Sequence, residues 1–264
     1  MVKPMAWAGI EVRLEGECAD WQVAAFMEEV ESGIAEFHFQ FSRPEPAVML
    51  RWEFPDIDLQ GRWSPLAFRS KLIPPNWGSR EVSQLASGAP VMTLFNQTGE
   101  NRLTFAFSDA MNQLEMHCGV EERNSVMECA LEAFRSPTAP VSGYECTLRL
   151  DIRPVRYERA LNDVAAWWAE MPEYRPSPVP AEAREVVYSS WYSYHQDLFA
   201  PELEAECRAA AGFGMKSIIV DDGWQTLDNH RGYAFCGDWE VCQERFPDMA
   251  AHVRNVHASG LKYV

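Results

Sequence analysis

The sequence carries little positive charge. Its lysines number four among 264 residues, and 23 Lys and Arg stand against 39 Asp and Glu, which gives a net charge of −16. Phosphate groups and anionic membrane surfaces are bound by clustered Lys and Arg, so this balance argues against both nucleic acid and a membrane as the partner. A neutral small molecule remains compatible with the composition.

Long apolar runs and paired cysteines are also missing. The start, MVKPMAWAGIEVRLEGE, has no long apolar segment, so no signal peptide is expected, and no run of about 18 apolar residues would cross a bilayer. The seven cysteines, an odd number without a CxxC pair, are Cys18, Cys118, Cys129, Cys146, Cys207, Cys236 and Cys242. Scattered cysteines of this kind indicate reduced thiols, and we expect a cytoplasmic protein.

Several catalytic and cofactor motifs are absent. The sequence contains no GxSxG, no P-loop and no HExxH. Gly212 and Gly214 precede a predicted strand and lack the third glycine of a dinucleotide fingerprint. Cys236 and Cys242 lack the second ligand pair of a zinc site. We therefore expect neither a cofactor nor a metal.

The histidines fit ordinary structural positions. His38 and His117 are most simply residues of the β-rich region that contains them. His252 and His257 are five residues apart on a predicted helix, about 140° out of phase, so they share no ligand face. A surface role is the prediction for this pair.

The composition is 47% apolar, enough for a proper core, and residues 1–158 have the pattern of a β domain. Phe37, Phe39 and Phe41 alternate with polar residues, and the same period of two recurs in RLTFAFS (102–108) and CTLRLDIR (146–153). Burial of one face of each strand is typical of antiparallel sheets packed face to face. An antiparallel β-sandwich is predicted here.

The pattern changes after residue 158. Leu161, Val164, Trp167 and Trp168 recur at helical spacing, and PEYRPSPVPAEA follows with four prolines in twelve residues. Residues 159–185 are therefore predicted to be a helical and proline-rich linker.

Strands and helices alternate in residues 186–264. Strands are predicted at 186–191, at SIIV (217–220) and at LKYV (261–264), with helices opened by Pro201 and Pro247 between them. This order predicts a parallel sheet, either a barrel or a doubly wound fold.

Two adjacent carboxylates end the middle strand of this region. Asp221 and Asp222 directly follow SIIV, and ligands of parallel α/β folds bind beyond the carboxyl ends of the strands. Capping of the next turn accounts for one carboxylate but poorly for two. Two neighbouring carboxylates accept several charge-assisted hydrogen bonds from adjacent hydroxyl groups of one ligand.

Aromatic residues occur near the same edge. Trp191 either packs against the apolar face of a ligand or caps the core, and Ser189, Ser190, Tyr192 and His195 are weaker candidates. Asp238 and Trp239 in the next loop are candidate site residues, with Trp239 offering a ring face to a pyranose, and Trp224 is expected at the rim.

Together these segments resemble a known family. SSW, an acidic helix with a glycine-rich end, IIVDDGW, GDW…RFP and GLKYV occur in an order that resembles the α-galactosidases of glycoside hydrolase family 36. The resemblance covers residues 186–264. It implies a supersandwich-like β-sandwich followed by the beginning of a (β/α)₈ barrel.

The resemblance also implies functional roles. In that family the paired aspartates hold the 4- and 6-hydroxyls of galactose, which assigns this role to Asp221 and Asp222, and the tryptophan of GDW, here Trp239, lines the sugar pocket. The implied partner is an α-galactoside of the melibiose or raffinose type. Family members are often oligomeric, which leaves a homo-oligomer open.

One departure from the family concerns catalysis. Family members are retaining enzymes whose nucleophile lies in a KxD motif after strand four and whose acid/base follows strand six. None of Lys3, Lys71, Lys216 and Lys262 is followed by x-Asp, so no catalytic residue is assigned and the chain alone is expected to be inactive. The prediction is the N-terminal part of a retaining α-galactosidase. The alternatives are a non-catalytic galactoside-binding or assembly protein, and a glycoside hydrolase or transglycosylase for another sugar.

Overall fold

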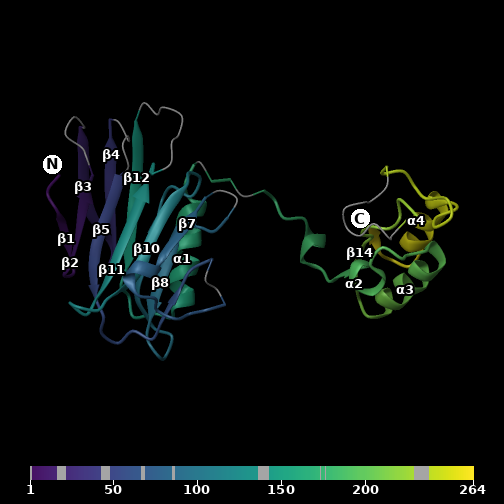
Figure 1. Cartoon of the computed structure of the whole chain (residues 1–264), viewed down its shortest axis with the longest axis horizontal. Helices are drawn as coiled ribbons and strands as arrows, with labels where there is room; N and C mark the ends of the chain where they lie inside the picture. The colour runs from purple at the N-terminus through teal and green to yellow at the C-terminus, as the bar shows by residue number, and fades with distance from the viewer. Residues whose placement is uncertain are drawn as a thin grey trace. The chain divides into compact units, whose positions relative to one another are not determined.

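The structure is a computed structural model that describes residues 2–16, 22–42, 48–66, 69–84, 87–135, 143–172, 174–175, 177–228 and 238–264, apart from the side chain of Glu182. These residues form two compact units, Met1–Arg175 and Pro176–Val264 (Figure 1). Each unit has a hydrophobic core of its own.

The first unit contains two antiparallel sheets of six strands each. The first sheet consists, in spatial order, of β1 (Met5–Trp7), β2 (Ile10–Glu15), β5 (Val48–Pro55), β11 (Val126–Ala133), β10 (Leu114–Glu121) and β7 (Arg80–Ser83). The second consists of β3 (Val23–Glu31), β4 (Ile34–Phe41), β12 (Tyr144–Asp151), β9 (Asn101–Phe107), β8 (Val91–Phe95) and β6 (Gly61–Trp63). A short 3₁₀ turn, η1 (Asn76–Gly78), precedes β7. The predicted antiparallel β-sandwich is confirmed.

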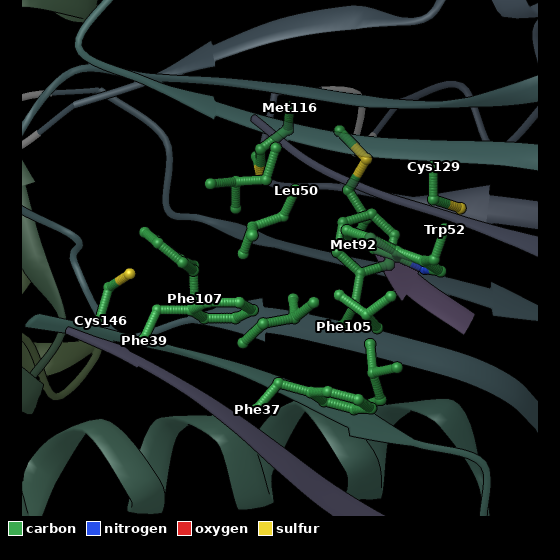
Figure 2. Packing of buried hydrophobic residues seen from close by; sticks show 14 of the residues in the cluster. Phe37, Phe39, Leu50, Trp52, Met92, Phe105, Phe107, Met116, Cys129 and Cys146 are labelled. Atoms are coloured by element: carbon green, nitrogen blue, oxygen red, sulfur yellow. The ribbon is translucent and has the colours of Figure 1, made fainter. Parts of the chain in front are cut away.

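Side chains from both sheets fill the space between them (Figure 2). Phe37, Phe39 and Phe41 of β4 all point into this core, as their period of two predicted, and each is buried. Trp52 of the first sheet meets Phe105 of the second edge to face, with ring centroids 5.0 Å apart. Edge-to-face contacts between large rings add to the stability gained from the buried apolar area.

Helix α1 (Tyr157–Ala169) lies against β8 and β9 of the second sheet. Val164 packs on Val91 and Ala106, and the Trp168 indole Nε1 donates a hydrogen bond to the carbonyl of Phe107 at 2.9 Å. This contact buries the face of β9 for which one-sided burial had predicted exposure. Helix α1 is therefore part of the first unit.

The second unit is a small α/β region. Its elements are η2 (Ala181–Arg184), β13 (Val187–Ser189), α2 (Trp191–Tyr194), α3 (Ala200–Gly212), β14 (Ser217–Ile219), α4 (Met249–Ala258) and β15 (Lys262–Tyr263). The strands form a parallel sheet in the order β13-β14-β15. This confirms the predicted alternation of strands and helices around parallel strands.

Two element boundaries differ from the prediction. Trp191, expected at the end of a strand, begins α2, and β13 ends at Ser189. Helix α4 begins at Met249 rather than at Pro247, because the Asp248 carboxylate accepts a hydrogen bond from the Ala251 N–H at 2.8 Å and caps the helix.

The predicted surface role of His252 is wrong. Its side chain is buried between the rings of Phe246 and Tyr263, and its Nδ1 lies 2.9 Å from an oxygen of Glu204. Because Glu204 belongs to α3, this contact joins α3 to α4. His257, on another side of the same helix, is exposed.

Helices α1 and α3 have 13 residues each, and within the described ranges no helix has both the length and the apolar character needed to cross a bilayer. Five cysteines are described, and all five are free: Cys118, Cys129, Cys146, Cys207 and Cys242. Cys18 and Cys236 lie outside the described residues.

Candidate functional site

The candidate site lies where the parallel strands of the second unit end. Ile218 of β14 is fully buried against the helices, and after Ile219 the chain leaves the sheet. Val220 still donates a hydrogen bond to Val264 beyond β15, at 2.9 Å. Asp221 and Asp222 follow at once and are half-buried, so both predicted carboxylates lie at the carboxyl edge of the middle strand.

Ser190 connects this edge to the neighbouring strand. The Ser190 hydroxyl is fully buried and accepts a hydrogen bond from the Asp221 N–H at 2.9 Å. The Ser190 N–H in turn donates to the carbonyl of Ile219 at 3.0 Å. Ser190 therefore joins the ends of β13 and β14 by two hydrogen bonds and fixes the backbone that carries both carboxylates.

A hydrogen bond links the two aspartates. One oxygen of the Asp221 carboxylate accepts a hydrogen bond from the N–H of Asp222 at 2.8 Å. Part of the hydrogen-bonding capacity of Asp221 is thus used by the N–H of the next residue.

Gly223 allows two loops to approach closely. Its φ is +113°, and a Cβ atom at this position would lie 2.3 Å from the carbonyl oxygen of Gln196. Only glycine fits such an approach at a positive φ. The Gly223 N–H also donates to the side-chain oxygen of Gln225 at 2.8 Å. The glycine of DDGW therefore has a steric function that sequence reasoning did not assign.

Two predicted aromatic residues meet beside the carboxylates. The rings of Trp224 and Trp239 pack edge to face with centroids 5.9 Å apart. Trp239 remains 70% exposed. The Cys242 N–H donates to the carbonyl of Trp224 at 2.9 Å and holds the two loop segments together. Asp238, next to Trp239, is exposed.

Trp191 lies on the β13 side of this edge. It directly follows Ser190, is the first residue of α2 and is half-buried. Its ring packs near that of His195, with centroids 5.1 Å apart. The structure thus places the predicted residues in two groups, Trp191 after β13 and the aspartates with the tryptophan pair after β14.

Arg245 joins the two loops that follow β13 and β14, and the sequence did not predict this role. Its side chain is almost fully buried, with Nε donating to the carbonyl of Thr226 at 2.7 Å and Nη1 to the carbonyl of Leu198 at 3.0 Å. The guanidinium also lies over the ring of Phe199, 4.8 Å from its centroid. One side chain therefore joins the loop after β13 to the loop after β14. The RFP segment contains this residue, but a buried role could not be distinguished from an exposed one by sequence.

Two ionisable groups on the helix side of the sheet are held neutral. Burial raises the pKa of Tyr263 to about 12 and that of the Cys207 thiol to about 11. At neutral pH both keep their protons.

No protein-family model matches the sequence, and no curated protein matches it. Solved structures do match. The α-galactosidase from Lactobacillus brevis is 15% identical, with a TM-score of 0.53 over 97% of this chain and 38% of the enzyme. An α-galactosidase from Thermus thermophilus, in complex with p-nitrophenyl α-D-galactopyranoside, is 19% identical, with a TM-score of 0.50 over 99% of this chain and 47% of the enzyme. The galactosidase domain of an α-galactosidase–sucrose kinase is 13% identical, with a TM-score of 0.51 over 98% of this chain and 40% of that domain.

This chain therefore shares the fold of a portion of such α-galactosidases, and the predicted resemblance is confirmed at the level of the fold. It spans between 38% and 47% of the length of these three relatives.

Proposed function

We propose that this chain is the sugar-recognising part of a retaining α-galactosidase that releases terminal α-linked galactose from oligosaccharides of the melibiose or raffinose type. The observation that carries the proposal is the pair Asp221 and Asp222, half-buried at the carboxyl end of β14. The three parallel strands of the second unit are, in this proposal, the first strands of a (β/α)₈ barrel.

The pair suits a hydroxyl-rich ligand for a physical reason. Each carboxylate accepts hydrogen bonds from hydroxyl donors, and a charged acceptor makes such bonds shorter and stronger than a neutral one. A site built to bond a hydroxyl discriminates strongly against a sugar that does not present it there. In the proposed complex Asp221 and Asp222 together take the 4- and 6-hydroxyls of galactose, and the exposed ring of Trp239 stacks on the apolar face of the sugar.

Bond cleavage requires two further groups. A retaining glycosidase uses a nucleophilic carboxylate and an acid/base about 5–5.5 Å apart. The aspartates of this chain are assigned to recognition, and none of its four lysines is followed by x-Asp. The catalytic pair of the proposed enzyme is therefore not assigned to these residues.

The test is hydrolysis by the complete product of the gene that encodes this chain. With melibiose, raffinose and p-nitrophenyl α-galactoside as substrates, the expected result is release of galactose, formed first as the α-anomer because a double displacement retains configuration. Failure to release galactose from any of the three substrates would overturn the proposal. First formation of the β-anomer would refute the retaining mechanism alone.

The absence of a KxD motif among the four lysines favours one second candidate, a galactoside-binding protein without hydrolytic activity. For that function, the 264-residue chain itself binds galactose and releases none from α-galactosides. Saturable binding measured by calorimetry, together with intact substrate after prolonged incubation, would select this candidate over the enzyme.

A further inference from the structure

A cluster of metal-ligating side chains lies on the outer face of the second sheet, in the sandwich unit. Glu28, Glu36 and His38 each direct one ligand atom into the same small volume, with these atoms all within 4.8 Å of one another. From this cluster we propose a binding site for a divalent transition metal, for which Zn²⁺ is the best-suited ion. The proposal is independent of the sugar-recognition function proposed for the second unit.

The pairing of β3 with β4 brings the three residues together. In the antiparallel register Glu28 lies opposite Glu36, and Phe26 lies opposite His38. Because side chains alternate along a strand, these four share the face opposite Phe37 and Phe39, which enter the core. The ligands therefore project from a rigid, hydrogen-bonded sheet rather than from a loop.

The spacing of the ligand atoms is near that of a metal site. His38 Nε2 lies 3.2 Å from an oxygen of Glu28 and 3.8 Å from an oxygen of Glu36. Zn²⁺ bonds of about 2.0–2.2 Å to N and O, arranged as a tetrahedron, place ligand atoms about 3.3–3.6 Å apart. The Glu28 side chain is 55% exposed, which leaves it room to adjust toward an ion.

Outer contacts already orient two of the three ligands. The Nδ1 atom of His38 lies 3.0 Å from the Thr147 hydroxyl, and in the proposed metal-bound form Nδ1–H would donate to this oxygen while Nε2 binds the ion. The Arg149 guanidinium holds the other oxygen of Glu36 and itself lies over the ring of Trp167, 5.5 Å from the centroid. Outer-shell partners of this kind fix ring orientation and tautomer in metal sites.

The charges of the cluster favour a cation. Like charges directly opposite each other across a strand pair are destabilising, and Glu28 and Glu36 are such a pair. Arg149 neutralises one of them. With a neutral imidazole, the side chains of Glu28, Glu36, His38 and Arg149 together carry a net charge of about −1. A bound divalent ion changes this net charge to about +1.

The donor set and the surroundings identify the class of ion. One imidazole nitrogen with two carboxylates suits Zn²⁺ and similar ions, whereas Ca²⁺ and Mg²⁺ prefer sites made of oxygen alone. His38 also lines a groove of about 620 Å³, together with Phe26, Gln40, Asp109, Tyr144 and Thr147. Three protein ligands beside a groove leave a coordination position for water or a hydroxyl-bearing ligand.

The experiment titrates the full 264-residue chain, without a histidine tag, with Zn²⁺ by calorimetry and with Co²⁺ by visible absorption at pH 8. We expect saturable binding by the unmodified chain, a tetrahedral Co²⁺ spectrum that Zn²⁺ abolishes, and a higher melting temperature with Zn²⁺. His38→Gln and Glu28→Gln are each expected to weaken metal binding by 10- to 100-fold or more. Each should also abolish the rise in melting temperature with Zn²⁺.

The matched controls are Glu29→Gln, next to Glu28 on β3, and His257→Gln on the exposed side of α4, and both should bind the metal as the unmodified chain does. Because Glu28 is largely exposed, Glu28→Gln tests the site even where His38→Gln lowers stability. Absence of saturable binding at pH 8 would overturn the proposal. So would binding that survives unchanged in both His38→Gln and Glu28→Gln, because the metal would then lie elsewhere in the chain.

Discussion

Replacing Arg245 with methionine is expected to destabilise the second unit by about 3–5 kcal/mol, because two buried carbonyls lose their donor, while leaving the sandwich unchanged. The methionine fills most of the space but cannot donate to the carbonyls of Thr226 and Leu198, which the guanidinium contacts at 2.7 and 3.0 Å. A buried carbonyl without its partner costs roughly 1–3 kcal/mol. Since domains are commonly stable by only about 5–15 kcal/mol, this loss removes a large share of the total.

Hydrogen exchange resolved by peptide measures this effect, with the sandwich as an internal reference. Peptides from β14 and α3 should exchange roughly 100-fold faster or more in Arg245→Met, and peptides from β4 and β12 should not change. Arg245→Lys keeps the charge but not the planar fork of donors, so its exchange rates in β14 and α3 should lie between those of Arg245→Met and those of the unmodified chain. Exchange in β14 that stays within about threefold of the unmodified chain would show that Arg245 does not hold these loops together.

Replacing Gly223 with alanine is expected to displace the loop that carries the aspartates. The added Cβ would lie 2.3 Å from the Gln196 carbonyl oxygen, and the φ of +113° is unfavourable for any residue with a Cβ. Overpacking at a site that cannot yield costs about 1–3 kcal/mol, and the backbone strain adds to this. Stability of the second unit should therefore fall by about 2–5 kcal/mol, and the position of Asp222 should be lost with it.

Gly212→Ala is the matched control for this substitution. Gly212 is the last residue of α3, and a Cβ there has no neighbour within 4 Å. Alanine in a helix is favoured over glycine by about 0.5–1 kcal/mol, so this variant should be equally stable or slightly more stable. Equal denaturation midpoints for Gly223→Ala and the unmodified chain would contradict the close approach seen in the structure.

The parts of the fold that follow from periodicity could be predicted from sequence. Phe37, Phe39 and Phe41 alternate with polar residues, and a sheet with one buried face is the simplest way to satisfy that pattern. The location of Asp221 and Asp222 could also be predicted, because a short apolar strand that stops at charged residues marks the carboxyl edge of a parallel sheet.

Features that depend on tertiary contacts could not be predicted. β9 has one face toward the core, but its other face is buried only because α1 docks there, and no local pattern in β9 reports that contact. His252 is polar and looks like a surface residue until α3 supplies Glu204 as its partner. The same holds for Arg245, because a charged side chain is rarely buried unless distant segments supply acceptors.

The central claim is that the carboxylate of Asp222 recognises the sugar. Its most direct test is the kcat/KM of the complete gene product on p-nitrophenyl α-galactoside, for the unmodified protein, for Asp222→Asn, and for the control Glu206→Gln on the exposed side of α3. A charge-assisted hydrogen bond lost from a buried contact is worth about 3 kcal/mol. The account predicts a drop in kcat/KM of roughly 100-fold or more for Asp222→Asn and no change for Glu206→Gln, with both variants folded. Activity of Asp222→Asn within about threefold of the unmodified protein would contradict it.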